Sequence, residues 1–223
     1  MTDEIDEVLR RTSLLGLVPD VDRKALAAAS RIRPFRRGQV VFTAGDPGDT
    51  LVVVVSGRVK VVLHSADGGE LTLTMVGPGE VLGDISVADG GPRSTDAETL
   101  ADSRLLLIPQ EAVREVCARV PAAANALTGS LAATLRRLTE SASDLVFLDL
   151  PRRVAKTLLS QPRGRGGIIE PSLSQEELAH QAAGTRQSVN AALRGFERRG
   201  WIEVRGRAVL VKEPAALDRF AGP

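Results

Sequence analysis

Hydrophobic residues between positions 31 and 82 recur with a period of two, and glycine-containing turns interrupt them at short intervals. The runs LVVVV, VKVVL and LTLTM are rich in β-branched residues, which favours strands, while GDPGD, SG, DGG and GPG are typical of turns. Many short strands joined by regular turns predict a β-sandwich or a closed β-roll. The glycines follow no fixed repeat length, so the pattern is not that of a solenoid.

Helical periodicity flanks this β-rich segment. Residues 4–17 and 22–30 have the pattern of short amphipathic helices, and after the strand SRLLLIP a short helix, QEAVREVCARV, precedes a long one over 121–148. Five apolar residues of the long helix are spaced 4, 3, 4 and 3, which is an a/d pattern: Leu131, Leu135, Leu138, Ala142 and Leu145. This seam favours a homodimer through the long helix, the alternative being a helix that packs on its own domain.

The C-terminal third has the pattern of a winged helix-turn-helix. Ser174 with Glu177 three residues later is a capping box that opens one helix, Gly184 ends that helix, and Thr185 caps the next. The segments WIEV and AVLV around RGR predict a two-stranded wing. The expected buried faces are Leu178, Ala179 and Ala182 in the first helix, and Val189, Leu193 and Phe196 in the second.

The charge of the chain changes sign near the end of the long helix. Residues 1–149 carry 16 Lys and Arg against 21 Asp and Glu, a net charge of −5, whereas residues 150–223 carry 13 against 7, a net charge of +6. A basic helix-turn-helix predicts double-stranded DNA as a partner, read by the first residues of the second helix. The residues expected at the bases are Thr185, Arg186, Gln187, Ser188 and Asn190, and those expected at phosphates are Arg198, Arg199, Arg205 and Arg207.

Several other classes of protein lack their required residues. A single cysteine, Cys117, excludes a disulfide framework, a cysteine zinc site and a four-cysteine iron–sulfur cluster. The two histidines, His64 and His180, are expected to be ordinary surface or packing residues, so we expect no metal. No catalytic triad or nucleophile motif supports an enzyme. The acidic start MTDEIDEVLRR and the absence of a long apolar run predict a cytoplasmic protein with no membrane contact.

Together these motifs resemble the cyclic-AMP receptor protein and fumarate–nitrate regulator family of bacterial transcription factors. The resemblance covers nearly the whole chain, and its details look closest to the actinobacterial cyclic-AMP receptor proteins. It rests on the β-roll turns, on GDISVADGGPRST, on the long helix running into DLVFLDLPRRVAKTLL, and on LSQEELAHQAAGTRQSVNAALRGFERRGWI. It implies an α+β fold with a cyclic-nucleotide-binding β-roll (jelly roll) over 1–118, a dimerisation helix and hinge over 119–149, and a winged helix-turn-helix over 150–223.

In that family the loop within VLGDISVADGGPRST, residues 81–95, is the phosphate-binding cassette. Backbone amides of a short turn or helix beginning at Gly83 can face an anion, and Arg93 can form a charge-assisted pair of hydrogen bonds with a phosphate. A carboxylate would repel the phosphate, so Asp84 is suited to the ribose 2′-hydroxyl. The residues expected at the ligand are Gly83, Asp84, Ile85, Ser86, Arg93 and Ser94, with Thr139 of the long helix as a candidate base contact.

Two positions depart from the pattern usual in the family. Asp84 stands where cyclic-AMP binders usually carry glutamate, so its carboxylate is one methylene shorter. Leu138 stands where well-studied cyclic-AMP sensors carry threonine; leucine cannot bond the exocyclic amine of adenine, and its place on the a/d seam explains it by packing. Cyclic AMP is the first expectation for the ligand. Another cyclic nucleotide, or a ligand-independent regulator with a degenerate pocket, are the alternatives.

The function implied by the resemblance is transcription regulation by a homodimer. The dimer binds palindromic double-stranded DNA, its DNA affinity is controlled by a nucleotide bound between the β-roll and the long helix, and RNA polymerase is a further expected partner. Such control requires that the ligand bind the DNA-competent state more tightly than the other state. Family members commonly have Ser-Arg-Glu-Thr at the start of the recognition helix, whereas this chain has Thr185-Arg186-Gln187-Ser188.

Overall fold

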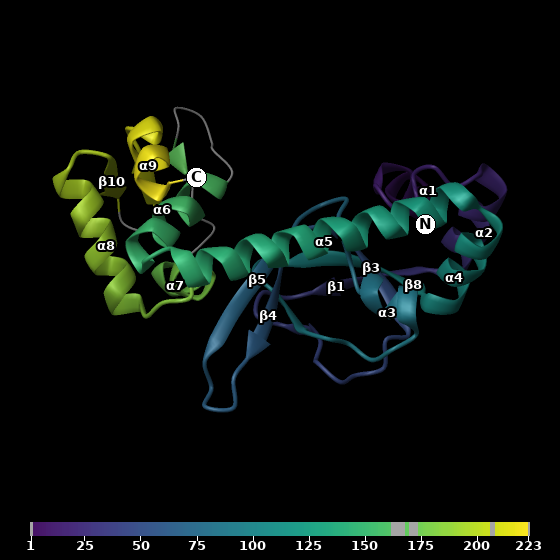
Figure 1. The fold of residues 1–223 in the computed structure, drawn as a ribbon. Helices are drawn as coiled ribbons and strands as arrows, with labels where there is room; N and C mark the ends of the chain where they lie inside the picture. Colours follow the sequence, from purple (N-terminus) through teal and green to yellow (C-terminus); the bar gives the residue numbers. More distant parts are fainter. Residues whose placement is uncertain (1, 162–167, 170–173, 206–207, 223) are drawn as a thin grey trace. The chain divides into compact units, whose positions relative to one another are not determined.

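The computed structural model describes residues 2–161, 168–169, 174–205 and 208–222 (Figure 1). The chain forms two compact units, one of residues 1–65 and 73–137 and the other of residues 66–72 and 138–223. The division therefore falls within a single long helix, α5 (Pro121–Phe147). Among the described residues, no helix is both long and apolar enough to cross a membrane.

The first unit is built around two four-stranded sheets with strand orders β1-β8-β3-β6 and β2-β7-β4-β5. The strands are β1 (Arg31–Phe35), β2 (Val40–Phe42), β3 (Thr50–Ser56), β4 (Val59–His64), β5 (Glu70–Val76), β6 (Val81–Leu82), β7 (Asp96–Thr99) and β8 (Ser103–Pro109). Every one of these strands contributes to one apolar core: Phe35, Phe42, Val52, Val54, Val59, Val76, Leu82, Ala97 and Leu105. The two sheets therefore enclose a shared core, which confirms the predicted β-roll.

Strand β3 is buried on both of its faces. Successive side chains of a strand point to opposite sides, and Val52 and Val54 belong to the core enclosed by the sheets, while Leu51 and Val53 belong to a second core beneath the helices. Strand β8, which pairs with β3, contributes to both cores in the same way. Coverage on both sides explains why the sequence of β3 is a continuous apolar run.

Helices α1 (Thr2–Arg11), α2 (Asp20–Ala29), α4 (Gln110–Arg119) and the first turns of α5 complete that second core (Figure 1). Helix α1 ends six residues earlier than the sequence pattern predicts. Thr12 Oγ1 donates to the Leu9 carbonyl at 2.7 Å and accepts from the Leu15 amide at 3.2 Å. These local hydrogen bonds offer the backbone an alternative to further helical turns.

The second unit contains the predicted winged helix-turn-helix. Its elements are α6 (Leu150–Ser160), β9 (Ile168–Ile169), α7 (Gln175–Gln181), α8 (Arg186–Arg198), β10 (Ile202–Arg205), β11 (Ala208–Val211) and α9 (Pro214–Ala221). The predicted wing strands pair as β10 and β11, and β9 adds a third strand beside β11. The residues predicted to face inward on α7 and α8 are all buried. Strand β9 and helix α9 had no clear sequence signal. Most of the glycine–arginine stretch, residues 162–167, lies outside the described residues.

Trp201 joins the wing to the helices of this unit. Its ring centroid lies 6.0 Å from that of Phe196 on α8 and 5.6 Å from that of Phe220 on α9. Phe196 is 1% exposed. The three rings form a continuous aromatic cluster, through which α9 packs on α8 and the wing in one core.

Candidate functional site

The loop after β6 contains a short helix, α3 (Asp84–Asp89), between two glycines in the left-handed conformation. Gly83 has a φ of 83° and Gly90 a φ of 75°. A Cβ at position 83 would lie only 1.9 Å from Nη1 of Arg93. Gly83 is therefore required for two reasons: its backbone conformation is costly for other residues, and the guanidinium lies directly against it.

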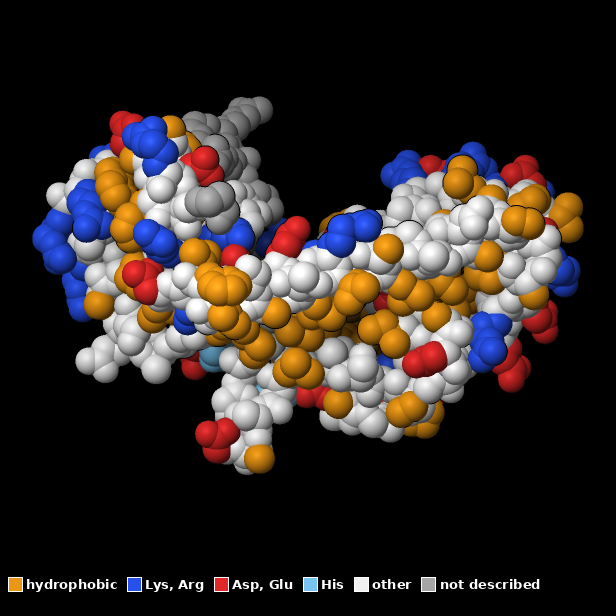
Figure 2. All heavy atoms as spheres, in the orientation of Figure 1, with side chains coloured by type: hydrophobic (Ala, Val, Ile, Leu, Met, Phe, Trp, Pro, Cys, Tyr) orange, Lys and Arg blue, Asp and Glu red, His pale blue; other side chains and the backbone are white. Residues whose placement is uncertain are grey.

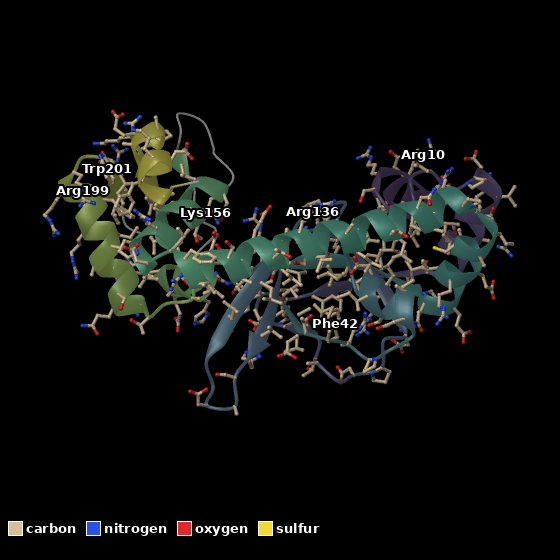
Figure 3. The ribbon with its side chains drawn as sticks, viewed as in Figure 1. Arg10, Phe42, Arg136, Lys156, Arg199 and Trp201 are labelled. Carbon is tan, nitrogen blue, oxygen red and sulfur yellow. The ribbon has the colours of Figure 1, made fainter. Side chains whose placement is uncertain are left out.

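Arg93 is buried, with 4% of its surface exposed. Its Nη2 donates to the Thr50 carbonyl at 2.6 Å and lies 2.9 Å from Thr50 Oγ1, and its guanidinium carbon lies 4.3 Å from the ring centroid of Phe42, which Figure 3 labels. The remaining donors, Nε and Nη1, are buried without a hydrogen-bond partner in the described part of the chain. Buried polar groups in proteins are nearly always paired, so these two donors point to a missing partner.

The electrostatics of Arg93 indicate the charge of that partner. Burial lowers the pKa of the Arg93 guanidinium, and the charges of Asp49 and Asp46 oppose this effect only in part. Arginine keeps its proton in proteins, so the desolvated cation is stabilised by an incoming anion. A phosphate suits this guanidinium, because arginine forms strong charge-assisted hydrogen bonds with phosphate oxygens.

The other predicted ligand residues differ in what they contact. Asp84 is half-buried, and its Oδ2 accepts a hydrogen bond from Ser130 Oγ on α5 at 2.6 Å. Ser86 is buried; its hydroxyl donates to the Pro92 carbonyl at 3.3 Å, and its carbonyl accepts from Gln110 Nε2. Ser86 thus holds the loop closed through internal contacts.

The remaining predicted ligand residues are Ile85 and Ser94 in the loop and Thr139 on α5. Ile85 is half-buried beside Asp84, and Ser94 is exposed next to Arg93. Thr139 lies on α5 within the second unit, and its role as a base contact stays a prediction. Sequence reasoning missed Thr50, Phe42 and Ser130, because nothing in their local sequence marks them as neighbours of the loop.

Helix α5 carries apolar residues that the chain itself leaves exposed. Leu131 is half-buried against the core of the first unit, but the exposed fractions of Leu138 and Leu145 are 40% and 44%, and those of Val146 and Phe147 are 73% and 76%. Leu135 is also exposed. Hydrophobic side chains gather along this helix in Figure 2. Large apolar side chains in such a row are typical of a protein interface.

The start of α8 presents the residues predicted to read DNA. Arg186 and Gln187 are exposed in its first turn, and Asn190 is half-buried. Thr185 and Ser188 are exposed, but their side chains form the helix cap: Thr185 Oγ1 accepts from the Ser188 amide at 3.2 Å and lies 2.9 Å from Ser188 Oγ. The cap fixes the start of the helix and so orients Arg186 and Gln187.

The turn between α7 and α8 differs in detail from the sequence prediction. The capping box of Ser174 and Glu177 is present. The left-handed residue after α7 is Ala183, with a φ of 49°, rather than Gly184. Gly184 is needed for close packing instead, since a Cβ there would lie 2.5 Å from Leu150 Cδ1.

Arg153 of α6 forms hydrogen bonds with the backbone of this turn. Its Nε donates to the Ala182 carbonyl at 2.8 Å, and its Nη2 donates to the Ala183 carbonyl at 3.1 Å. Its Nη1 donates to the Leu148 carbonyl at 2.8 Å, just beyond the end of α5. One guanidinium therefore ties the turn that orients α8 to the segment that precedes α6.

The arginines predicted to contact phosphates have different surroundings. Arg198 is exposed, whereas the Arg199 guanidinium lies over the rings of Trp201 and Phe220, at 4.9 and 5.5 Å from their centroids (Figure 3). Arg205 Nε donates to Glu203 at 2.6 Å; this bond and one from Lys212 lower the pKa of Glu203 to about 2. Arg207 lies outside the described residues. Basic side chains surround α8 in Figure 2.

The described residues contain no group of three or more His, Cys, Asp or Glu that could hold a metal ion. His64 lies 2.5 Å from Asp96 on the β-roll. Cys117 is half-buried, and burial raises the pKa of its thiol.

The fold and these two sites define a class of protein, in which a ligand-binding β-roll is joined by a long helix to a winged helix-turn-helix. Comparison with known families agrees with this arrangement. Residues 32–120 match the family described as "Cyclic nucleotide-binding domain", and residues 152–220 match the "Crp-like helix-turn-helix domain".

Individual relatives are similar over nearly the whole chain. The "CRP-like cAMP-activated global transcriptional regulator" of Mycobacterium tuberculosis is 38% identical over 97% of this chain and 100% of its own length. The "Cyclic AMP receptor protein" of Thermus thermophilus is 33% identical over 92% of this chain and 94% of its own length. The chain belongs to the cyclic-AMP receptor protein and fumarate–nitrate regulator family. It is a transcription regulator, not an enzyme, with a cyclic-nucleotide-binding domain and a DNA-binding helix-turn-helix domain.

Solved structures share the fold. FixK2 from Bradyrhizobium japonicum has a TM-score of 0.77 at 20% identity, covering 84% of this chain and 95% of its own. The c-di-GMP responsive global regulator CLP from Xanthomonas campestris has a TM-score of 0.73 at 27% identity, covering 82% of this chain and 94% of its own.

Two buried arginines allow a matched test of the unpaired charge at Arg93. Arg23 is also buried, but it bonds Asp6 at 2.7 Å and Asp20 at 2.6 Å, and these hydrogen bonds raise its pKa, opposite to Arg93. We expect Arg93→Met to leave the free energy of unfolding within about 1 kcal/mol of wild type, because an unpaired buried cation contributes little. Arg23→Met should clearly destabilise the protein, since it leaves two carboxylates without their partner. Chemical denaturation without ligand measures both, and equal losses would contradict the assignment of Arg93 as an unpaired cation.

Proposed function

We propose that this protein is a homodimeric, sequence-specific DNA-binding regulator whose DNA affinity is controlled by a cyclic nucleotide, with cyclic AMP as the first candidate. The observation that carries the proposal is the buried Arg93 guanidinium, two of whose donors have no partner among the described residues. A cyclic phosphate supplies one negative charge and two exocyclic oxygens, which accept charge-assisted hydrogen bonds from a guanidinium.

The ligand is assigned by the groups that accompany the arginine. The Asp84 carboxylate, at the start of the same loop, accepts hydrogen bonds only, so it suits a ribose hydroxyl rather than a second phosphate. Relatives that are 38% and 33% identical are named for cyclic AMP. The exposed Thr139 remains the candidate contact with the base.

The homodimer is proposed from the leucine seam of α5. Exposed Leu138 and Leu145 lie seven residues apart, so on a helix they share one face. A two-fold dimer presents two copies of α8 to a palindromic DNA site, with half-sites about one helical turn, or roughly 34 Å, apart. Such a regulator works in the bacterial cytoplasm, with RNA polymerase as a further partner.

A ligand-independent regulator is the second candidate. It is favoured by the shorter acid at Asp84 and by the apolar Leu138, which cannot bond an adenine amine. The two candidates differ in a single measurable property, the binding of a nucleotide at Arg93.

Calorimetric titration with cyclic AMP, cyclic GMP and c-di-GMP tests the ligand directly. We expect wild type to bind cyclic AMP, and Arg93→Met to lose at least about a hundredfold in affinity, because the charge-assisted hydrogen bonds to the phosphate disappear. Arg119→Ala is the matched control, since Arg119 is exposed on α4 and pairs with Asp22. Absence of binding by wild type to all three nucleotides would favour the ligand-independent regulator.

Leu138→Glu tests the dimer, with Ser143→Glu as the control on the opposite side of the same helix. We expect the Leu138 variant to weaken dimerisation at least about a hundredfold, because each dimer would bury two unpaired carboxylates. Ser143→Glu should leave the dimer intact. Analytical ultracentrifugation measures both, and an unchanged dimer in the Leu138 variant would place the interface elsewhere.

Gln187 is expected to change which base pair is read. Glutamate only accepts hydrogen bonds and suits cytosine N4, whereas glutamine both donates and accepts and suits adenine. We expect wild type to select a palindrome with guanine opposite Arg186 and a relaxed or adenine-shifted preference at the pair beside Gln187. Gln187→Glu should move that preference toward cytosine and weaken non-specific DNA binding. Selection from random DNA compares the two proteins, and identical half-sites would mean that residue 187 reads no base.

A further inference from the structure

The face of α5 that packs on the β-roll has a polar residue where its buried apolar positions end. Ala123 and Leu127 are buried in the core of the first unit, and the i, i+4, i+7 spacing continues to Ser130. Helical periodicity calls for an apolar residue at that position. The contact that Ser130 makes accounts for the exception.

Ser130 is bonded to the acid of the nucleotide loop. Its Oγ lies 2.6 Å from Asp84 Oδ2, although the two residues are 46 positions apart in the chain. The carboxylate has no proton to give, so the serine hydroxyl is the donor. This distance is at the short end for a hydroxyl on a carboxylate, which is typical of a charge-assisted hydrogen bond.

This hydrogen bond restricts the direction in which Asp84 can accept another. A carboxylate has about four lone-pair positions. Ser130 occupies one of them on Oδ2, and the Ile85 amide donates to Oδ1 at 3.1 Å. With that oxygen held, the remaining lone pairs keep a fixed orientation before any ligand arrives. Fixing an acceptor in advance lowers the entropic cost of forming the next hydrogen bond.

We propose that Ser130 is a positioning residue for the nucleotide site, which orients the Asp84 carboxylate toward the ribose 2′-hydroxyl and so selects ribonucleotides over 2′-deoxyribonucleotides. The inference rests on the proposed function. It also explains the shorter acid: a glutamate would carry its carboxylate one carbon–carbon bond further, into the space that Ser130 Oγ occupies. Asp84 and Ser130 are therefore a matched pair, and the aspartate is not a weakened glutamate.

The test compares the affinities for cyclic AMP and 2′-deoxy cyclic AMP, measured calorimetrically with the full-length protein. Wild type should prefer cyclic AMP by about tenfold or more, the value of one hydrogen bond to a charged group. Ser130→Ala should weaken cyclic AMP several-fold and leave 2′-deoxy cyclic AMP unchanged. Ser130→Thr, which keeps the hydroxyl, should restore the preference. Thr128→Ala is the control, because Thr128 is exposed on α5 and its hydroxyl donates to the Ala124 carbonyl of the same helix.

Asp84→Glu provides a second, independent comparison. It should weaken cyclic AMP binding in wild type and have little effect in the Ser130→Ala background, where the obstructing hydroxyl is absent. Equal weakening of both nucleotides by Ser130→Ala, or no weakening at all, would overturn the positioning role and leave the proposed function standing. Failure of wild type to bind any cyclic nucleotide would overturn the proposed function itself, and the inference with it.

Discussion

The buried guanidinium of Arg93 is the constraint on which the proposed nucleotide site depends. A cation with two donors that lack a partner in the described part of the chain costs free energy in the ligand-free protein. Thr50, the face of Phe42 and the charges of Asp49 and Asp46 offset that cost in part. The loop is organised around this side chain: Gly83 lacks a Cβ where the guanidinium lies, and the Ser86 and Asp89 contacts close the turn that returns the chain to Arg93. The folded protein therefore carries part of the desolvation cost of this cation before any ligand binds. A bound anion offsets that cost, which makes its binding more favourable.

Helix α5 makes different contacts along its length, because the burial and polarity of its residues change from its start to its end. Its first turns bury Ala123 and Leu127 against the β-roll, and Ser130 then meets the acid of the nucleotide loop. From Leu135 onward its large apolar residues, including Leu138 and Leu145, are exposed. The residue that touches the nucleotide loop therefore lies on the same helix as the proposed dimer seam. A ligand that changes the hydrogen bonds of Asp84 would therefore affect α5 directly. Coupling between a ligand and an interface requires such a shared structural element.

In the DNA-binding unit, several contacts fix the recognition helix before DNA arrives. The Thr185 and Ser188 side chains cap α8, and Arg153 holds the preceding turn through the carbonyls of Ala182 and Ala183. The aromatic cluster of Phe196, Trp201 and Phe220 joins α8, the wing and α9. Arg186 and Gln187 are consequently presented on a rigid element, where small differences in hydrogen-bonding groups can discriminate between bases.

The sequence by itself determined the elements whose signals are local. Period-two and helical patterns marked the strands and helices, the capping box of Ser174 and Glu177 marked α7, and the spacing of Asp84 and Arg93 marked the loop. Only the tertiary structure decided the partners of those residues. Ser130 is 46 residues from Asp84, and Thr50 is 43 residues from Arg93, so neither contact leaves a periodic or local trace. Strand β9 and helix α9 are likewise short, and packing against β11 and α6 rather than intrinsic propensity holds them in place. Propensity and capping act over a few residues, whereas the identity of a buried partner depends on which distant segments the folded core brings together.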